Sequence, residues 1–189
     1  RPVPDGSQIH VSVTRRMPGG SPHTQETYLP ADSNVLVPWQ FEPLASREEV
    51  FATVQIVSAV HQPLSAVSEV LHFEAGLFEE FDHIADFVGP SWPEAETDHR
   101  RLPLVRAEVE LDDEPVRARL YLSALGLVEA EINGRKVGND SLIPGWTDYN
   151  NRVECWTYDV TEALNAGANA LGFWLGDGWY RGRLGFDGG

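Results

Sequence analysis

The regular alternation of apolar and polar residues in the second half of the chain constrains the fold most. In the runs 105–111 and 116–124, apolar residues occupy every second position and Arg, Glu and other polar residues stand between them. Successive side chains of a strand point to opposite faces of a sheet, so each run predicts a strand with one buried face. Further strands are predicted at 127–132, 152–158 and 170–175, with at most a helical turn at 159–164. Short strands without a long helix between them indicate an antiparallel β-sandwich from about residue 102 onward.

A hairpin is predicted within this region. Asn133-Gly134 separates the segments 127–132 and 135–137. Asn and Gly both accept the positive φ angles of a type I′ turn, which is the usual two-residue connection between antiparallel strands. We therefore expect a tight turn with positive φ at Gly134.

The first half of the chain predicts a smaller β domain. One short strand is expected at 9–13, followed by loop up to residue 34, and further strands at 50–57 and 70–74. The segment 78–101 contains the dipeptides Gly89-Pro90 and Trp92-Pro93 and then an acidic run, as expected of a linker. The predicted domains are residues 1–80 and 102–189, joined by a linker at 81–101.

Composition narrows the range of partners. The formal net charge is −15, which opposes binding to nucleic acid or to an anionic membrane surface and favours a neutral ligand. Cys155 is the one cysteine, so neither an intrachain disulfide nor a thiolate zinc site is expected. No apolar run approaches the roughly 18 residues of a membrane span. Because the chain starts at Arg1 without Met, we expect it to be part of a longer protein, and its compartment stays open.

No catalytic residue is predicted. Glu108 and Glu110 share one strand face, and Glu129 and Glu131 share another, which is the pattern of a solvated sheet surface more than of a glycosidase pair. The histidines lack the spacing of a zinc site, and no serine lies in a nucleophile elbow. The glycines at 176, 178 and 182 miss the dinucleotide-binding fingerprint, and no helix is expected after them.

Aromatic residues crowd the last third of the chain. For Phe173 and Trp174, which lie in a predicted buried strand, core packing is the favoured interpretation. The segment 177–186 instead places aromatic and Arg side chains between glycines, where a ligand site and a plain surface loop are about equally supported. Sugar sites combine a flat aromatic face with hydrogen-bonding groups. The candidate ligand-binding residues are Asp177, Trp179, Tyr180, Arg181, Arg183 and Trp146.

Five segments in a fixed order carry a resemblance to a known family. They are LYLSALG at 120–126, EINGRKVG at 131–138, PGWTDY at 144–149, TYDVT at 157–161 and GDGWYRGRLGF at 176–186. Together they resemble the N-terminal domain of bacterial α-L-rhamnosidases over roughly residues 84–189. Residues 71–77 and 87–90 look like the end of the immunoglobulin-like or fibronectin-like domain that precedes it in that family.

The resemblance implies an all-β fold in which a small immunoglobulin/fibronectin-like segment is followed by a jelly-roll-like antiparallel β-sandwich. It implies an accessory, carbohydrate-recognition region that binds L-rhamnose-containing glycosides. The catalytic partner in that family is a downstream (α/α)₆ barrel, so this region is itself expected to be inactive. Calcium is the cofactor that the resemblance suggests, and the candidate oxygen ligands are Asn133, Asp140 and Asp177. The alternatives are a purely structural docking domain, which the sequence does not separate from sugar binding, and a self-contained hydrolase, which the absent catalytic residues disfavour. For a bacterial protein of this kind the sequence leaves the compartment open between cytoplasmic and secreted.

Overall fold

The structure is a computed structural model that describes residues 4–32, 35–79, 82, 85–91 and 102–182. The chain divides into two compact units, Arg1–Ala85 and Asp86–Gly189, and each is described by itself. The division falls inside the segment 81–101 that the sequence assigns to a linker, and the domain bounds given above stay a prediction. No helix in the described residues is long and apolar enough to cross a membrane.

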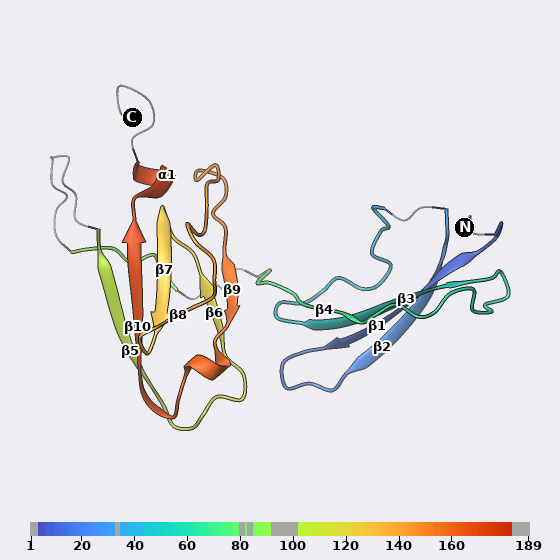
Figure 1. Ribbon diagram of the computed structural model, residues 1–189, viewed down its shortest axis with the longest axis horizontal. Coiled ribbons are helices and arrows are strands. Elements are labelled where there is room, and N and C mark those ends of the chain that lie inside the picture. Colours follow the sequence, from blue (N-terminus) through green and yellow to red (C-terminus); the bar gives the residue numbers. More distant parts are fainter. Residues whose placement is uncertain (1–3, 33–34, 80–81, 83–84, 92–101, 183–189) are drawn as a thin grey trace. The chain divides into compact units, whose positions relative to one another are not determined.

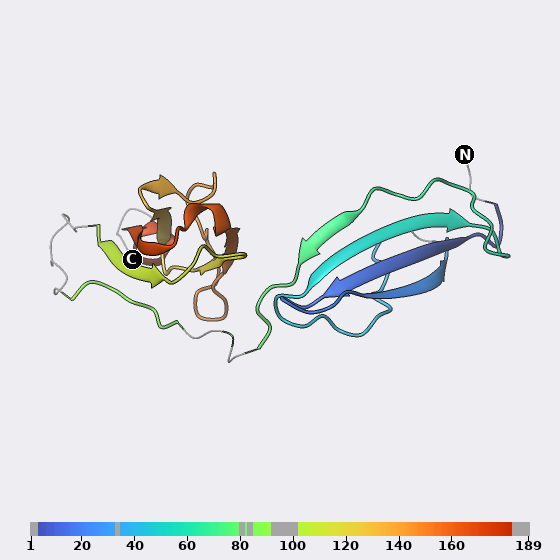
Figure 2. The same cartoon turned by 90° about the horizontal axis from the view of Figure 1, so that it is seen from below.

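Unit 1 is built on one antiparallel sheet of four strands. The strands, in sheet order, are β2 (His23–Pro30), β1 (Gln8–Arg16), β3 (Glu49–Val57) and β4 (Leu71–Glu74), which lie side by side in Figure 2. The sequence predicted β1, β3 and β4 but interpreted the residues of β2 as loop, which is wrong. β2 pairs with β1 alone, and two of its half-buried residues, Gln25 and Thr27, are polar. An edge strand with polar residues at its half-buried positions lacks the alternation of apolar and polar residues from which a strand is predicted.

One face of this sheet is apolar and the other is polar and aromatic. Paired residues of neighbouring strands share a face, so Val13 lies beside Ala52 and near Val50, and both valines are fully buried. On the opposite face, the ring of Phe51 stacks on His72 at 4.5 Å between ring centroids. Burial does not follow these faces along the whole of β3, because Val57 on the Phe51 face is 2% exposed and Val54 on the Val50 face is 46% exposed.

An ion pair helps to cover the buried face at one end of β1. The Arg15 guanidinium donates two hydrogen bonds of 2.7 Å to the Glu48 carboxylate, and both side chains are largely buried. Arg15 also donates to the backbone carbonyls of Glu42 and Pro43, each at 2.9 Å. The loop before β3 is thus held against the sheet by charge-assisted hydrogen bonds.

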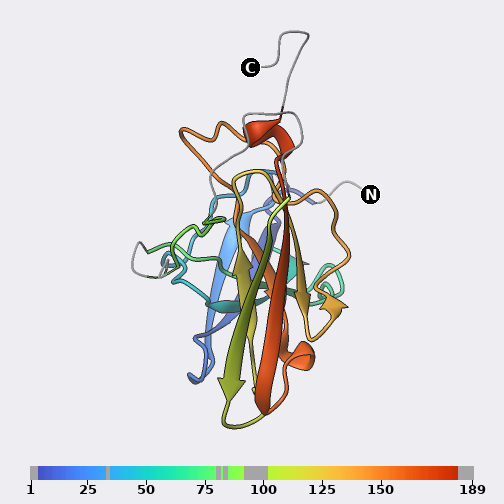
Figure 3. The ribbon, with the colours of Figure 1, turned by 90° about the vertical axis from the view of Figure 1, so that its left-hand side faces the viewer.

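Unit 2 contains two antiparallel sheets. The larger one has the order β5 (Leu104–Leu111), β10 (Gly167–Gly176), β7 (Leu127–Ile132) and β8 (Arg135–Lys136), and the smaller one pairs β6 (Arg119–Leu122) with β9 (Trp156–Asp159). Figure 3 shows β5 and β10 side by side. The helical elements of the described residues in this unit are the 3-10 helix η2 (Thr161–Ala163) and the four-residue α1 (Gly178–Arg181). The all-β prediction is confirmed, whereas jelly-roll topology stays a prediction.

The core of unit 2 lies between its two sheets. Its buried members are Leu122, Ala124, Val128, Ala130, Ile132, Val137, Ile143 and Val160. Phe173 of β10 packs against them, as predicted, but Trp174 is 53% exposed. The core position favoured for Trp174 is therefore wrong, because consecutive residues of a strand point to opposite faces. Glu129 and Glu131 face away from the core, as predicted for a solvated sheet surface.

The predicted hairpin joins β7 to β8. Asn133 and Gly134 have φ angles of +52° and +76°, which confirms positive φ at Gly134. The Asn133 side chain accepts a hydrogen bond from the Ala170 amide at 2.9 Å and donates one to the Asn169 side chain at 2.9 Å. The turn is thus tied by its own side chain to the neighbouring strand β10.

Candidate functional site

Two aromatic segments meet at one end of unit 2. α1 follows the end of β10, and the loop 143–152 before β9 rises at the same end of the sheets (Figure 1). The ring of Tyr149 in this loop contacts the ring of Tyr180 edge-on, with centroids 5.2 Å apart. We call this surface, formed by the loop 143–152 and residues 177–181, the loop end.

The loop end presents aromatic side chains to solvent. Trp146 is 72% exposed and Trp179 is 41% exposed, and Tyr180 is exposed as well. Beside them, the Arg181 guanidinium lies 3.8 Å from the Asp177 carboxylate, and both side chains are partly accessible. Flat rings with a cation and an anion nearby form a surface that can stack on a ligand and hydrogen-bond its edges.

Glycines near α1 serve the packing of the chain against itself. Gly178 has a φ of +51°, and a Cβ atom there would lie 2.8 Å from the Leu127 side chain. A Cβ on Gly126 would lie 2.4 Å from the Gly176 carbonyl oxygen. Gly178 therefore permits the turn 125–127 to pack against the start of α1.

The loop 143–152 is stiffened by its own hydrogen bonds. The Thr147 hydroxyl donates to the Arg152 carbonyl at 2.6 Å, and the Trp156 indole donates to the Pro144 carbonyl at 3.3 Å. Asp148 accepts hydrogen bonds from the amide of Asn150 and the side chain of Asn151. Trp146 is therefore held out to solvent on an ordered loop, which lowers the entropy that binding would cost.

Most of the predicted ligand-binding residues gather at the loop end. Asp177, Trp179, Tyr180 and Arg181 lie on or beside α1, and Trp146 joins them through the loop that contacts Tyr180. Arg183 lies outside the described residues. Tyr149, which connects the two segments, was not among the predicted site residues. Its place in the aromatic-rich stretch 146–158 is the sequence signal that could have included it.

The predicted metal ligands do not come together. Asn133 follows β7 and Asp177 lies beyond Leu127 at the other end of that strand, a separation on the order of 20 Å. Asp140 accepts a hydrogen bond from the Tyr158 hydroxyl at 3.1 Å. Burial raises the pKa of Tyr158 to about 12, and this hydrogen bond acts in the same direction. Among the described residues, no group of three or more His, Cys, Asp or Glu could hold a metal ion.

Two family models match the chain, one in each unit. Residues 5–79 match the Rha78A-like, N-terminal immunoglobulin domain. Residues 113–189 match the alpha-L-rhamnosidase N-terminal domain. Between them the two models cover most of both units.

Curated relatives named alpha-L-rhamnosidase share sequence with the chain. The protein from Streptomyces avermitilis is 54% identical over 85 residues, which are 44% of this chain and 8% of the relative. The protein from Alteromonas sp. (strain LOR) is 35% identical over 154 residues, which are 78% of this chain and 17% of the relative. The chain thus spans less than a fifth of the length of these relatives.

Solved structures resemble the chain as well. The alfa-L-rhamnosidase from Aspergillus terreus matches 99% of this chain and 22% of its own, with a TM-score of 0.81 and 38% identity. The alpha-L-rhamnosidase from Dictyoglumus thermophilum matches 95% of this chain and 22% of its own, with a TM-score of 0.76 and 26% identity.

Proposed function

Since the chain belongs to the N-terminal region of the α-L-rhamnosidases, we propose that it is an accessory, carbohydrate-recognition region of such an enzyme. The observation that carries the proposal is the loop end, where Tyr149 contacts Tyr180 and where Trp146, Trp179 and Tyr180 are each exposed. The C–H face of a sugar ring packs on an aromatic face, and its hydroxyls need donors and acceptors at the rim. Asp177 and Arg181 supply such groups.

Catalysis belongs, in this proposal, to another domain of the same protein. The paired glutamates Glu108 and Glu110, and Glu129 and Glu131, lie on the outward face of the larger sheet of unit 2. A glycosidase needs two carboxyl groups on opposite sides of the bond to be cleaved, whereas each of these pairs occupies successive outward positions of one strand. The parent enzyme removes terminal α-L-rhamnose, and its catalytic partner domain is the (α/α)₆ barrel of the family. The 189-residue chain alone should not hydrolyse an aryl α-L-rhamnoside.

Titration of the 189-residue chain with L-rhamnose tests sugar recognition. We expect a dissociation constant in the millimolar range, because the loop end is an open surface and not an enclosed pocket. Trp179→Ala and Trp146→Ala should each weaken binding at the loop end at least about tenfold, while Trp39→Ala should leave it unchanged. Trp39 is a matched control because it is 44% exposed and lies in unit 1. Equal binding by all three variants would overturn the assignment of the loop end.

A structural docking role is the second candidate, and the same exposed aromatic surface favours it. Neighbouring exposed rings also suit a protein interface. If the loop end only docks onto the catalytic domain, L-rhamnose will not bind to the loop end at any accessible concentration, with or without added calcium. Trp179→Ala in the full-length enzyme should then increase hydrogen exchange at the domain junction without any change in sugar affinity.

A further inference from the structure

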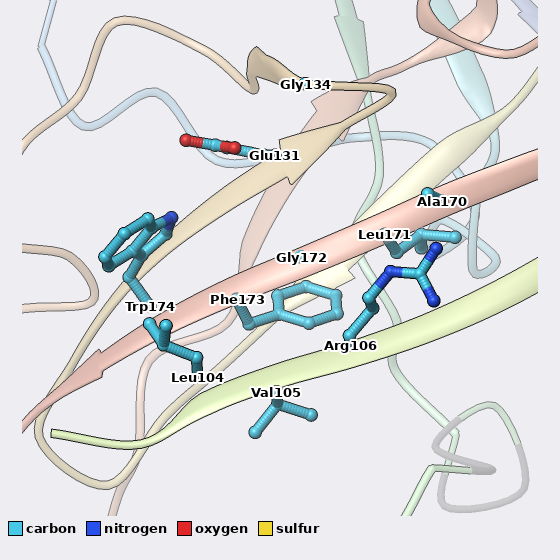
Figure 4. Close-up of a pocket in the computed structure, with 10 residues that line it drawn as sticks. All are labelled: Leu104, Val105, Arg106, Glu131, Gly134, Ala170, Leu171, Gly172, Phe173 and Trp174. Atoms are coloured by element: carbon cyan, nitrogen blue, oxygen red, sulfur yellow. The ribbon is translucent and has the colours of Figure 1, made fainter. Parts of the chain in front are cut away.

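The outward face of the larger sheet in unit 2 carries a pocket that shares no residue with the loop end. Its volume is about 270 Å³. Figure 4 shows the residues around it, which come from β5, β10, β7 and the turn after β7. The side chains that point away from the core here are those of Leu104, Arg106, Glu131, Ala170 and Trp174, with Gly172 among them.

The register of the three strands builds this pocket. Gly172 in the central strand β10 pairs with Arg106 on one side and with Glu131 on the other. A Cβ atom at Gly172 would meet no other atom within 4 Å, so the space above the strand is open. Two positions further along β10, the Trp174 ring stands on the same face. The pocket thus has a backbone floor, a charged group on each side and an aromatic ring at one end.

The chemistry of the walls selects a neutral ligand with both an apolar face and polar edges. Within the part of the chain that the structure describes, the exposed Arg106 pairs with the exposed Glu108 at 2.6 Å, and its remaining donors can reach a ligand. Glu131 offers acceptors on the opposite side. The net charge of −15 on the chain disfavours an anionic ligand. Small-molecule pockets measure roughly 300–1,000 Å³, so a pocket just below this range suits a ligand no larger than a single sugar ring.

We propose that this pocket is a second carbohydrate-binding site, which takes one neutral pyranose ring against Trp174 and above Gly172. Its hydroxyls donate to Glu131 and accept hydrogen bonds from Arg106. The inference rests on the proposed function in one respect, which is that the ligand is a carbohydrate. Its residues, and the face on which they lie, are independent of the loop end.

Gly172→Val is the decisive variant because it fills the floor of the pocket without disturbing the fold. The φ angle of Gly172 is not in the left-handed region, its Cβ position is unobstructed, and β-branched residues favour strands. Trp174→Ala removes the ring, and Trp174→Phe restores an aromatic face. The exposure of Trp174 makes both changes tolerable.

The experiment is a titration of the 189-residue chain with methyl α-L-rhamnopyranoside, followed by NMR of the indole N–H groups. Comparison with Trp174→Ala and Trp179→Ala assigns the resonances of the two tryptophans. We expect the Trp174 resonance to shift with a millimolar dissociation constant. Gly172→Val should weaken that response at least about tenfold with an unchanged melting temperature, Trp174→Phe should keep binding, and Trp179→Ala should leave the Trp174 response intact.

The possible outcomes separate the two sites. A Trp174 resonance that stays still while that of Trp179 moves would overturn the second site and support the loop end. The reverse would support the second site and remove the loop end as the sugar-binding surface. If neither moves, both sugar assignments are wrong. An unchanged Trp174 response in Gly172→Val would also overturn the pocket, since the ring would then bind sugar without the floor.

Discussion

The two units differ in the kind of residue that they bury. In unit 2, the residues between the sheets form an apolar cluster, and the buried polar residues described there, Thr147 and Asn169, are uncharged. In unit 1, the buried apolar residues are fewer, and the described structure buries the carboxylates of Glu48, Glu49 and Asp82. Each of these carboxylates has an arginine partner. Unit 1 therefore depends on charge where unit 2 depends on packing.

The difference shows what each unit can tolerate. Apolar packing is indifferent to pH but sensitive to lost volume. A buried ion pair repays its desolvation only while both partners are charged and fully hydrogen-bonded, and removing one partner leaves an uncompensated charge. The two units should thus fail under different perturbations, and hydrogen exchange read separately in β1 and β7 can follow each of them.

Ile132→Ala should have the largest effect and should be confined to unit 2. Ile132 is 2% exposed in the centre of the core, so the substitution leaves a cavity and should cost about 3.5 kcal/mol of unfolding free energy. Protection of β7 amides should fall while that of β1 amides stays the same. Val54→Ala, at an exposed position of unit 1, is the control with little expected cost. Equal losses in β1 and β7 would show that the two units unfold as one.

Glu48→Gln should produce the converse effect in unit 1. It leaves the buried Arg15 guanidinium without its counter-charge, which costs about 3 kcal/mol, near the lower end for such pairs, because the carbonyls of Glu42 and Pro43 still accept hydrogen bonds. Amides of β1 should lose protection and those of β7 should not. Glu26→Gln, at a position where the carboxylate is exposed, should change the protection of β1 amides very little. Unchanged protection of β1 in Glu48→Gln would mean that packing, and not charge, holds the loop before β3 to the sheet.

Acid should destabilise unit 1 before unit 2. The hydrogen bonds from Arg15 hold the pKa of Glu48 below its ordinary value of 4.5. A lowered folded-state pKa means that this stabilisation is complete above the pKa of the unfolded chain and disappears as pH falls through the folded-state value. In unit 2, the Thr161 hydroxyl lowers the pKa of Asp159, but that carboxylate is 62% exposed and should contribute little.

A pH series of hydrogen exchange measures this difference between the units. Protection in β1 should decline below about pH 4.5, and Glu48→Gln should remove most of that decline. A decline that is the same in the variant would assign the acid sensitivity to other carboxylates.

Gly134→Val should have the smallest effect. The φ of +76° strains any β-branched residue, while the open space around the Gly134 Cβ position excludes a steric clash, so the expected loss is about 1 kcal/mol. Thermal unfolding of unit 2 is the measurement. Gly134→Asn should retain most of the stability because Asn tolerates this region. An equal loss in both variants would point to an unrecognised side-chain contact and not to backbone strain.

Sequence patterns predicted those parts of the fold that depend on neighbours in the chain. The period of two located β5 and β7, and Asn133-Gly134 located the hairpin, because both signals are local. The pairing of Arg15 with Glu48 joins residues 33 positions apart, and no pattern in the sequence marks it. The polar edge strand β2 was missed for the same reason, since its pairing with β1 and not its composition makes it a strand.

The candidate site was predictable in its residues but not in its geometry. Aromatic and Arg residues among glycines pointed to residues 177–186, and in the described part of this segment, 177–182, Trp179 is exposed. The contact of Tyr149 with Tyr180 required the folded loop. Consecutive residues of β10 face opposite sides of the sheet, so the burial of Phe173 places Trp174 on the outward face. The sequence did not indicate this, because the run Ala170 to Leu175 is almost wholly apolar and hides which residues face the core.

The amide of Asn169 has a consequence for the whole of β10. It is 1% exposed and takes part in four hydrogen bonds, with Asn133, Gly167 and twice with Asn165. A slip of β10 by one residue in its pairing register would exchange the two faces of the strand, so that Trp174 would be buried and Phe173 exposed. The hydrogen bonds to Asn165 and Gly167 are local and would move with the strand, but the one from Asn133 in the β7–β8 turn forms in one register alone. A buried amide five residues from Trp174 therefore helps to fix the face of the sheet on which Trp174 lies.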